Sequence, residues 1–286
     1  MGHAQDDASK QARLQNQVST GQKIFEAEDN PSAVGRVLNL ESEQRQIAQY
    51  DRNATRAVTI SQASFAGLQA VKKVSDRATE IGALGSGVNG AAANTAYATE
   101  VDQLIEQAYQ AANARYGNDY LFAGTAVDAQ PFTVTRGADG KISAVAYVGN
   151  SDRAAIAVSA TSQLTPGTAG ATNASLGDFI NNLVALRDAL TANDRTAVAT
   201  AQDSLIADEN SLVSSIAELG GIQTRIEASQ SQLKDRATNL ATLVSDEVDA
   251  DLPSTLVKLN QATTAYQAAL QSGAKIMQLS LLDYIR

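Results

Sequence analysis

The sequence predicts a mainly α-helical fold, an elongated long-helix bundle or coiled coil formed by both chain ends, with a small β-rich insert in the middle. Three observations predict it. Apolar residues recur at spacings of three and four over long stretches at both ends of the chain. Of the 286 residues 44% are apolar but only 5% aromatic, and only 4 are Pro, so helices meet few forced stops and thick cores are disfavoured. Between the helical halves the apolar period shortens to that of strands.

Composition excludes several classes of protein. The net charge of −9 and the lack of a Lys/Arg cluster argue against binding to nucleic acid. With no Cys, disulfides and Cys-ligated metals are excluded. No run of about 18 apolar residues exists, which predicts no membrane insertion. The polar and acidic start of the chain does not have the pattern of a cleavable signal peptide.

No group of residues predicts a catalytic, cofactor or metal site. His3 is the only histidine, so Ser-His-Asp catalysis and histidine metal sites are ruled out. The acidic residues at 246–251 lack the Gly and the spaced Glu of a calcium loop, and they are predicted to be a solvated helix face. The glycine-rich stretch 82–90 has no Gly-Lys-Ser ending and is predicted to be a turn between helices. We therefore predict that the chain is not an enzyme.

The N-terminal half is predicted to hold a short helix and then a very long one. The first helix spans about residues 4–23 and is broken at Ser19-Thr20-Gly21. After an acidic loop, Asn30 precedes Pro31 as a helix cap. An apolar helical pattern then continues to Gly82 without Pro, close to 50 residues, which at ~1.5 Å per residue makes a rod of about 70 Å.

The middle of the chain is predicted to change from helix to strand. A helix over residues 94–115 follows the glycine turn. The segment 117–125 is predicted to be a turn that enters a strand. Residues 132–135 and 142–148 flank an Asp-Gly turn and predict a hairpin, and residues 156–158 predict a further strand. Residues 126–174 together form the predicted β insert.

Long helices return in the C-terminal part. One is predicted from Leu176, and a second, of about 50 residues, follows a cap at Asp194. Pro253 predicts a break near residues 249–252. The final segment, 252–286, carries a heptad seam that needs a partner helix. The seam residues predicted to mediate assembly are Leu256, Leu259, Tyr266, Leu270, Met277, Leu281, Leu282 and Tyr284.

Three motifs resemble the flagellar hook-filament junction proteins, also called hook-associated protein 3, of the flagellin superfamily. The first is the N-terminal loop, with Ser19-Thr20-Gly21-Gln22-Lys23-Ile24 and then Asp29-Asn30-Pro31. The second is the stretch Gly117-Asn118-Asp119-Tyr120-Leu121-Phe122-Ala123-Gly124-Thr125. The third is the ending Leu279-Ser280-Leu281-Leu282-Asp283-Tyr284-Ile285-Arg286. In this order they cover both ends and the middle of the chain.

The resemblance implies a structural protein that joins hook to filament and is exported to the extracellular flagellum by the type III apparatus without a cleaved signal. Its implied partners are copies of itself in a ring, the neighbouring hook-associated protein, flagellin and an export chaperone. It implies an inner coiled-coil layer from residues 1–31 and 252–286, a helical rod from 32–125 and 175–251, and an outer domain from 126–174. The family carries a longer segment before the first motif than this sequence does.

Three other functions stay open at this point. Flagellin shares the N-terminal loop and the helical ends, although the 117–125 motif and the Leu282-Asp283-Tyr284 ending count against it. A cytoplasmic coiled-coil scaffold would also have long Ala-rich helices, but it would not need a β insert. An enzyme that uses only Asp and Glu is the most remote of the three.

Overall fold

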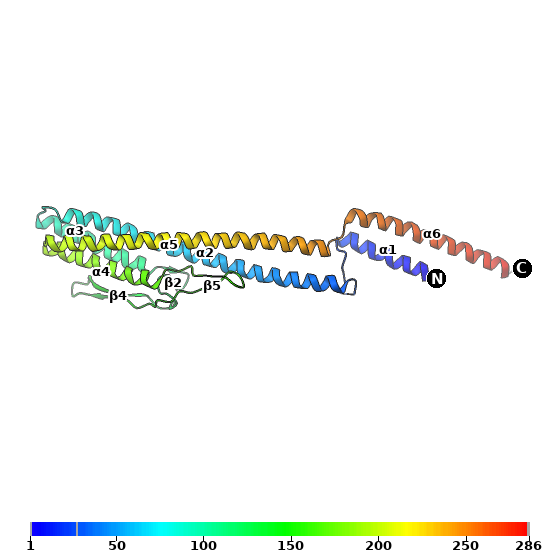
Figure 1. Cartoon of the computed structure of the whole chain (residues 1–286), viewed down its shortest axis with the longest axis horizontal. Helices are drawn as coiled ribbons and strands as arrows, with labels where there is room; N and C mark the ends of the chain where they lie inside the picture. Colours follow the sequence, from blue (N-terminus) through cyan, green and yellow to red (C-terminus); the bar gives the residue numbers. More distant parts are fainter. Residues whose placement is uncertain (1, 27, 285–286) are drawn as a thin grey trace. The chain divides into compact units, whose positions relative to one another are not determined.

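The computed structural model describes the backbone of residues 2–26 and 28–284 and the side chains of residues 5–26 and 28–275. Its helices are α1 (Gly2–Thr20), α2 (Pro31–Gly85), α3 (Ala91–Ala112), α4 (Gly170–Ala192), α5 (Arg195–Val248) and α6 (Leu252–Tyr284) (Figure 1). The mainly helical prediction with a small central β insert is confirmed. The chain divides into two compact units, Met1–Ala48 with Asp235–Arg286, called unit 1, and Gln49–Lys234, called unit 2.

The long helices α2 and α5 begin where the sequence predicts. Asn30 accepts a hydrogen bond from the Ala33 backbone N–H at 3.1 Å, and Asp194 accepts one from Ala197 at 3.1 Å, so both residues are N-caps. The helix α5 ends at Val248 and α6 begins at Leu252, as Pro253 predicted.

A strict heptad of buried residues runs along α5. Its members are Val198, Leu205, Leu212, Leu219, Ile226, Leu233 and Leu240. The buried positions on α2 are both small, including Ala54, Ala57, Ser61, Ser64, Ser75 and Ala78, and large, including Ile47, Leu68, Val71, Val74 and Ile81. A seven-residue repeat keeps one face of a helix turned toward its partner.

Four helices surround the core of unit 2 in the cyclic order α2, α3, α4, α5. Arg77 on α2 bonds Glu100 on α3, and α3 packs extensively on α4. Asn182 on α4 bonds Asp208 on α5, and Lys72 on α2 bonds Glu209 on α5. The helices α2 and α5 are therefore adjacent and run in opposite directions.

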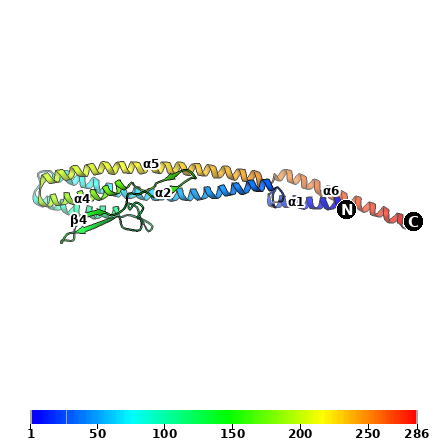
Figure 2. The ribbon, with the colours of Figure 1, turned by 60° about the horizontal axis from the view of Figure 1, so that its bottom comes forward.

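The β insert consists of three two-stranded antiparallel sheets. They pair β1 (Arg115–Tyr116) with β2 (Asp119–Tyr120), β3 (Phe132–Arg136) with β4 (Ile142–Tyr147), and β5 (Ile156–Ala157) with β6 (Gln163–Leu164). The hairpin β3–β4 turns at Asp139–Gly140 as predicted, and it lies along α4 in both views (Figures 1 and 2). The hairpin β3–β4 thus covers the α3/α4 side of the bundle, whereas other parts of the insert contact α2 and α5.

Several predicted boundaries were wrong by a few residues. Residues 170–174, predicted as insert, form the first turns of α4, and Gly82 and Gly85 lie inside α2 rather than in the turn. The helix α3 begins at Ala91 and ends at Ala112, earlier at both ends than predicted. Strand β6 was missed because Gln163–Leu164 is too short to show a period. The predicted division of the assembled protein into layers stays a prediction.

Candidate assembly surfaces

The first motif forms a joint at which the two ends of the chain meet. The Lys23 N–H donates to the Val248 carbonyl at 2.7 Å, and the Ala250 N–H donates to the Gly21 carbonyl at 2.7 Å. These two bonds pair the segment after α1 with the segment between α5 and α6, like a minimal antiparallel sheet. The Lys23 ammonium group also donates to the Asp246 carbonyl. The acidic stretch 246–251 therefore anchors the N-terminal loop.

Asp29 organises the rest of this loop. Its carboxylate accepts backbone N–H bonds from Phe25 at 3.0 Å and Glu26 at 3.2 Å, and it pairs with Arg13 at 3.0 Å. The two backbone hydrogen bonds lower the pKa of Asp29 most, because they favour the charged carboxylate, and the charge of Arg13 lowers it further. The predicted motif residue Asp29 thus shapes the loop that leads into α2.

A bidentate ion pair joins α2 to α5 beside the joint. Arg36 donates to both carboxylate oxygens of Glu247, at 2.8 and 2.9 Å. The paired hydrogen bonds raise the pKa of Arg36 and lower the pKa of Glu247. Glu247 was predicted to belong to a solvated face, and the structure instead gives it a partner more than 200 residues away in the chain.

The helices α1 and α6 pack against each other in unit 1. Leu14 of α1 and Ala262 of α6 are each 8% exposed. Among the described side chains of α6, the buried or partly buried positions are Ser254, Thr255, Leu259, Ala262, Thr263, Tyr266, Ala269 and Gly273. Of the predicted seam residues, Leu259 and Tyr266 therefore lie on the shielded side of α6.

Other seam residues do not face α1. Leu252, Leu256 and Leu270 are 43%, 46% and 50% exposed. Their predicted inward orientation is wrong for the single chain, because the contact with α1 follows Thr255 and Ala262 instead. The side chains of Met277, Leu281, Leu282 and Tyr284 lie outside the described residues. α6 consequently has an apolar face, containing Leu256 and Leu270, that the described part of its own chain does not cover.

The second motif is built around a tight hairpin and a buried ring. The hairpin β1–β2 turns at Gly117–Asn118, and Phe122 behind it is fully buried. The backbone of α2 approaches this ring so closely at Gly67 that a Cβ there would lie 2.8 Å from Phe122. The glycines of the two motifs, Gly21, Gly117 and Gly124, all have positive φ, at 74°, 61° and 70°.

Asn150 closes the second motif from the other side of the insert. Its amide oxygen accepts from the Thr125 N–H at 2.9 Å, and its amide nitrogen donates to the Thr125 hydroxyl at 2.8 Å. A Cβ on Gly124 would lie 2.2 Å from the Asn150 amide oxygen. No local pattern in the sequence indicates the role of Asn150, because its partner Thr125 lies 25 residues away.

The motif docks on α2 through polar contacts around an open cavity. Arg56 pairs with Asp119 at 3.8 Å, and Asn53 donates to the Ala157 carbonyl at 2.8 Å. The Arg115 guanidinium lies 4.2 Å from the centre of the Tyr120 ring, a cation–π contact. The cavity, of about 350 Å³, lies among α2, the motif and residues 152–168.

Two asparagines fix the hairpin β3–β4 on the bundle. Asn181 of α4 accepts from the Val145 N–H at 2.8 Å and donates to the Val145 carbonyl at 2.9 Å. Asn113, after α3, accepts from the Phe132 N–H at 3.1 Å and donates to the Phe132 carbonyl at 3.3 Å. Each amide thus replaces a neighbouring strand at one edge of the hairpin, where unpaired backbone groups would otherwise remain.

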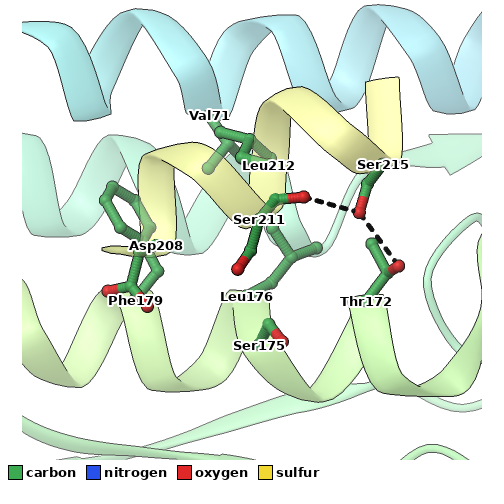
Figure 3. A pocket seen from close by; sticks show the side chains of 9 residues that line it. All are labelled: Val71, Thr172, Ser175, Leu176, Phe179, Asp208, Ser211, Leu212 and Ser215. Carbon is green, nitrogen blue, oxygen red and sulfur yellow. Dashed lines mark hydrogen bonds between the residues drawn. The ribbon is translucent and has the colours of Figure 1, made fainter. Parts of the chain in front are cut away.

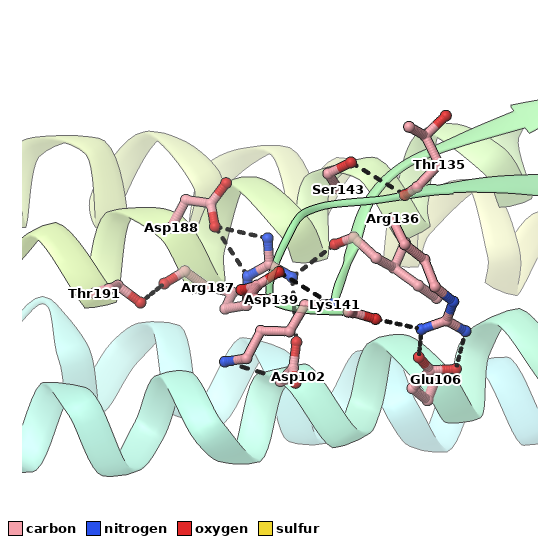
Figure 4. A network of polar contacts seen from close by, with 12 residues as sticks. Asp102, Glu106, Thr135, Arg136, Asp139, Lys141, Ser143, Arg187, Asp188 and Thr191 are labelled. Carbon is pink, nitrogen blue, oxygen red and sulfur yellow. Dashed lines mark hydrogen bonds and ion pairs between the residues drawn. The ribbon is translucent and has the colours of Figure 1, made fainter.

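Charged residues hold the turn of the same hairpin (Figure 4). Arg187 of α4 donates to the Ile142 carbonyl at 2.7 Å and pairs with Asp102 and Asp188. Burial acts to lower the pKa of Arg187, but the two carboxylates outweigh it and the pKa is raised. Arg136 pairs with Glu106 of α3, which raises the pKa of Arg136. The hairpin is therefore a fixed part of unit 2.

A small polar cavity of about 20 Å³ lies among α2, α4 and α5 (Figure 3). Val71, Leu176 and Leu212 form its apolar wall, and the Thr172 and Ser215 hydroxyls bond each other at 3.1 Å. Its volume suits a single water molecule rather than a substrate. Asp208 also lines it, and burial raises the pKa of this carboxyl, with the charge of Asp178 adding to the effect.

No metal-binding or membrane-spanning feature is found in the described part of the chain. The described residues hold no group of three or more His, Asp or Glu that could bind a metal ion. None of the described helices is long and apolar enough to cross a membrane.

Comparison with known proteins identifies relatives of the chain. Residues 3–127 match the family described as the bacterial flagellin N-terminal helical region. Flagellar hook-associated protein 3 of Escherichia coli (strain K12) is 26% identical over 299 residues, which cover 93% of this chain and 90% of that protein. The chain is therefore similar to flagellar hook-associated protein 3 over nearly the whole length of both proteins.

Solved structures of hook-associated proteins have the same fold. A protein of Vibrio parahaemolyticus described as a flagellar hook-associated protein superposes with a TM-score of 0.69 at 19% identity, over 77% of this chain and 100% of that one. FlgL of Bacillus cereus gives a TM-score of 0.62 at 17% identity, over 72% of this chain and 99% of that one. The predicted resemblance to hook-associated protein 3 is confirmed.

Proposed function

We propose that this chain is a structural subunit of the bacterial flagellum that joins the hook to the filament. The observation that carries the proposal is the similarity to a hook-associated protein over nearly the whole length of both chains. A match over nearly the whole chain supports a shared place in the flagellum more strongly than a match to one helix pair would. Such a subunit needs neither a catalytic site nor a cofactor.

Copies of the chain would assemble through the ends of the chain. The apolar face of α6 with Leu256 and Leu270 is exposed beside the face that packs on α1. Leu259 and Tyr266 would support the helix pair, and Met277, Leu281, Leu282 and Tyr284 would continue the apolar face. Burying a large apolar side chain contributes about 1.5–3 kcal/mol, so a few such residues per copy can hold a ring or a helical tube together.

The proposed partners follow from the position between two tubes. One end of the ring would contact the neighbouring hook-associated protein, and the other would contact flagellin. The subunit would leave the cell through the flagellar type III apparatus without cleavage of a signal, and an export chaperone would cover the apolar α6 face before export. The final location would be the extracellular flagellum.

Deletion of the gene tests the proposal. We expect hooks without filaments in electron micrographs, loss of swimming, and unpolymerised flagellin in the medium. Restoring the gene on a plasmid should restore the filaments. Normal filaments in the deletion strain would reject the junction role.

Flagellin is the second candidate, and the match of residues 3–127 to the flagellin N-terminal region favours it. Copy number separates the two functions. Quantitative mass spectrometry of isolated flagella should find a small number of copies per flagellum, of the order of one ring, for a junction protein. A filament subunit would be present in thousands of copies.

A further inference from the structure

Two opposite faces of the unit 2 bundle carry, among the described residues, charges of opposite sign that have no ion-pair partner: Lys73 on one face, and Asp178 and Asp208 on the other. Because the helices follow the cyclic order α2, α3, α4, α5, the α2/α3 face lies opposite the α4/α5 face. The hairpin β3–β4 packs on α4 and touches α3. It therefore covers the side between these two faces. The rest of the insert contacts α2 at Asn53 and Arg56 and α5 at Glu218, more than two helical turns along these helices from Lys73 and Asp208.

The α2/α3 face contains a groove of about 620 Å³, and Lys73 and Arg77 are among the residues that line it. Ala66, Ala70 and Ala111 line it with small side chains, so a neighbouring helix could approach closely. Lys73 in the groove is exposed and has no ion pair or hydrogen bond among the described residues. Arg77 also lines the groove, but Glu80 and Glu100 already pair with it.

The α4/α5 face is acidic at the corresponding place. Asp178 of α4 is exposed and, within the described ranges, forms no ion pair or hydrogen bond. Asp208 of α5 accepts a hydrogen bond from Asn182 at 2.7 Å but has no cationic partner among the described side chains. Since each carboxylate is repelled by the other, a cation placed between them would be favoured.

Lys73 on one face and Asp208 on the other lie at the same level along the bundle axis. Lys72, next to Lys73, contacts Glu209 at 3.2 Å, and Asp208, next to Glu209, bonds Asn182. Lys73, Asp208 and Asn182 therefore belong to one cross-section of the bundle. Asp178 lies one helical turn from Asn182, about 6 Å along α4. Two copies placed side by side in the same orientation would bring Lys73 of one copy to Asp178 and Asp208 of the other.

We propose that the groove between α2 and α3 binds the α4/α5 face of a second copy of this chain, with Lys73 paired to Asp178 and Asp208. The contact uses different surfaces on the two copies, so it leaves both outer faces free and can repeat around a ring or tube. The charge pair would set the register between neighbours, while the alanines permit close contact. This lateral contact rests on the proposed function, because it is the contact that neighbouring subunits of a ring or tube would make.

Cysteine cross-linking tests the contact directly, because the natural chain has no Cys. The full chain is prepared separately as Lys73→Cys and Asp178→Cys, concentrated, and treated with a short bifunctional maleimide. We expect a cross-linked dimer when the two variants are mixed and none from either variant alone. A dimer from Lys73→Cys alone would mean a two-fold contact and would overturn the proposal, as would the absence of any dimer in the mixture.

Charge reversal gives an independent test by sedimentation velocity. Lys73→Glu and Asp178→Lys should each weaken self-association about tenfold, since like charges then face each other. The double variant should recover most of the loss. Arg195→Glu makes the same change of charge at an exposed position at the start of α5, more than three helical turns from Asp208, and should change nothing. Equal weakening by Arg195→Glu, or no recovery in the double variant, would contradict a specific pair.

The outcomes separate this inference from the proposed function. Circular dichroism should show all variants to be folded, because the substituted side chains are exposed. If the gene deletion leaves bare hooks while the mixed cysteine variants do not cross-link, the junction role stands and the lateral contact is wrong. If the cysteine of the Lys73→Cys variant is cross-linked to a different protein in isolated flagella, the groove does not bind a second copy of this chain and the proposal is also wrong.

Discussion

Single residues in the second motif are fixed by distant neighbours rather than by their local sequence. Gly124 combines a left-handed backbone with contact to Asn150, whereas Gly117 has the same backbone region and open space around it. The two glycines therefore answer different constraints. Gly117 only allows a turn, whereas Gly124 also packs against Asn150, which lies 26 residues further along the chain.

Gly124→Ala should destabilise unit 2 more than Gly117→Ala. A left-handed Ala costs about 1–2 kcal/mol in either place. At Gly124 the new methyl group would also clash with Asn150, so the total loss should be roughly 3 kcal/mol or more. Urea unfolding of the two variants measures the difference. Equal losses would show that Asn150 moves away freely.

The partly buried carboxyl of Asp208 should reduce stability at neutral pH. Because its pKa is raised in the folded protein, the folded state holds the proton more tightly than the unfolded chain does. Stability should then fall as the pH rises from the ordinary carboxyl value of 3.8 through the raised value, and stay lower above it. Asp208→Asn should remove this loss and raise stability at pH 7 by about 1 kcal/mol.

Thermal unfolding of this variant between pH 3 and pH 8 checks the sign. Asp203→Asn, at an exposed position of the same helix, is the matched control and should have little effect. A lower melting temperature for Asp208→Asn at pH 7 would mean that the charged form of Asp208 is the favoured one.

At the scale of elements, the hairpin β3–β4 keeps its place through side-chain amides. A two-stranded hairpin is barely stable alone in water, so its attachment decides whether it forms. Asn113 and Asn181 bond the hairpin at one residue on each edge. The hairpin itself was predictable from its Asp-Gly turn, but its fastening to α3 and α4 was not.

Asn181→Ala should loosen the hairpin without unfolding the helices. The change removes two hydrogen bonds to Val145 and should cost about 1–2 kcal/mol locally. Hydrogen exchange at the Val145 amide should become about tenfold faster. Ser143→Ala removes only a side-chain bond to the Thr135 carbonyl, so it should leave the Val145 amide protected. Unchanged exchange in Asn181→Ala would show that Asn181 does not fix the hairpin.

At the scale of the whole molecule, the two ends of the chain form one compact unit. The joint at Lys23–Val248 and the ion pair Arg36–Glu247 bring residues more than 200 positions apart into contact. Each end of the chain has an apolar stripe that needs a partner helix. The packing of α1 on α6 covers one face of α6, and the face with Leu256 and Leu270 stays accessible to other molecules.

The double change Leu256→Asp and Leu270→Asp should prevent assembly while the chain stays folded. Both side chains are about half exposed, so folding loses little. Assembly would lose at least ~3 kcal/mol, a factor of more than a hundred in affinity. Replacing Leu270 and Met277 together should have the same effect. Complementation of the deletion strain, scored by filaments and swimming, is the measurement.

Val148→Asp, an exposed apolar position in the insert, is the control for this change and should restore swimming. Full swimming with the α6 double variant would rule out this face as an assembly surface.

The sequence by itself determined the helices, the breaks between them and the family resemblance. These features depend on local signals: apolar period, caps at Asn30 and Asp194, the Asp-Gly turn and Pro253. Only the tertiary structure decided which face of α6 meets α1 and which residues anchor the motifs. A heptad stripe predicts that α6 needs a partner helix. Both Leu256 and Thr255 lie near this stripe, and only the packing against α1 decides which of the two side chains is buried. Asn150, Asn181 and Glu247 gained their roles from partners far along the chain, which no local pattern records.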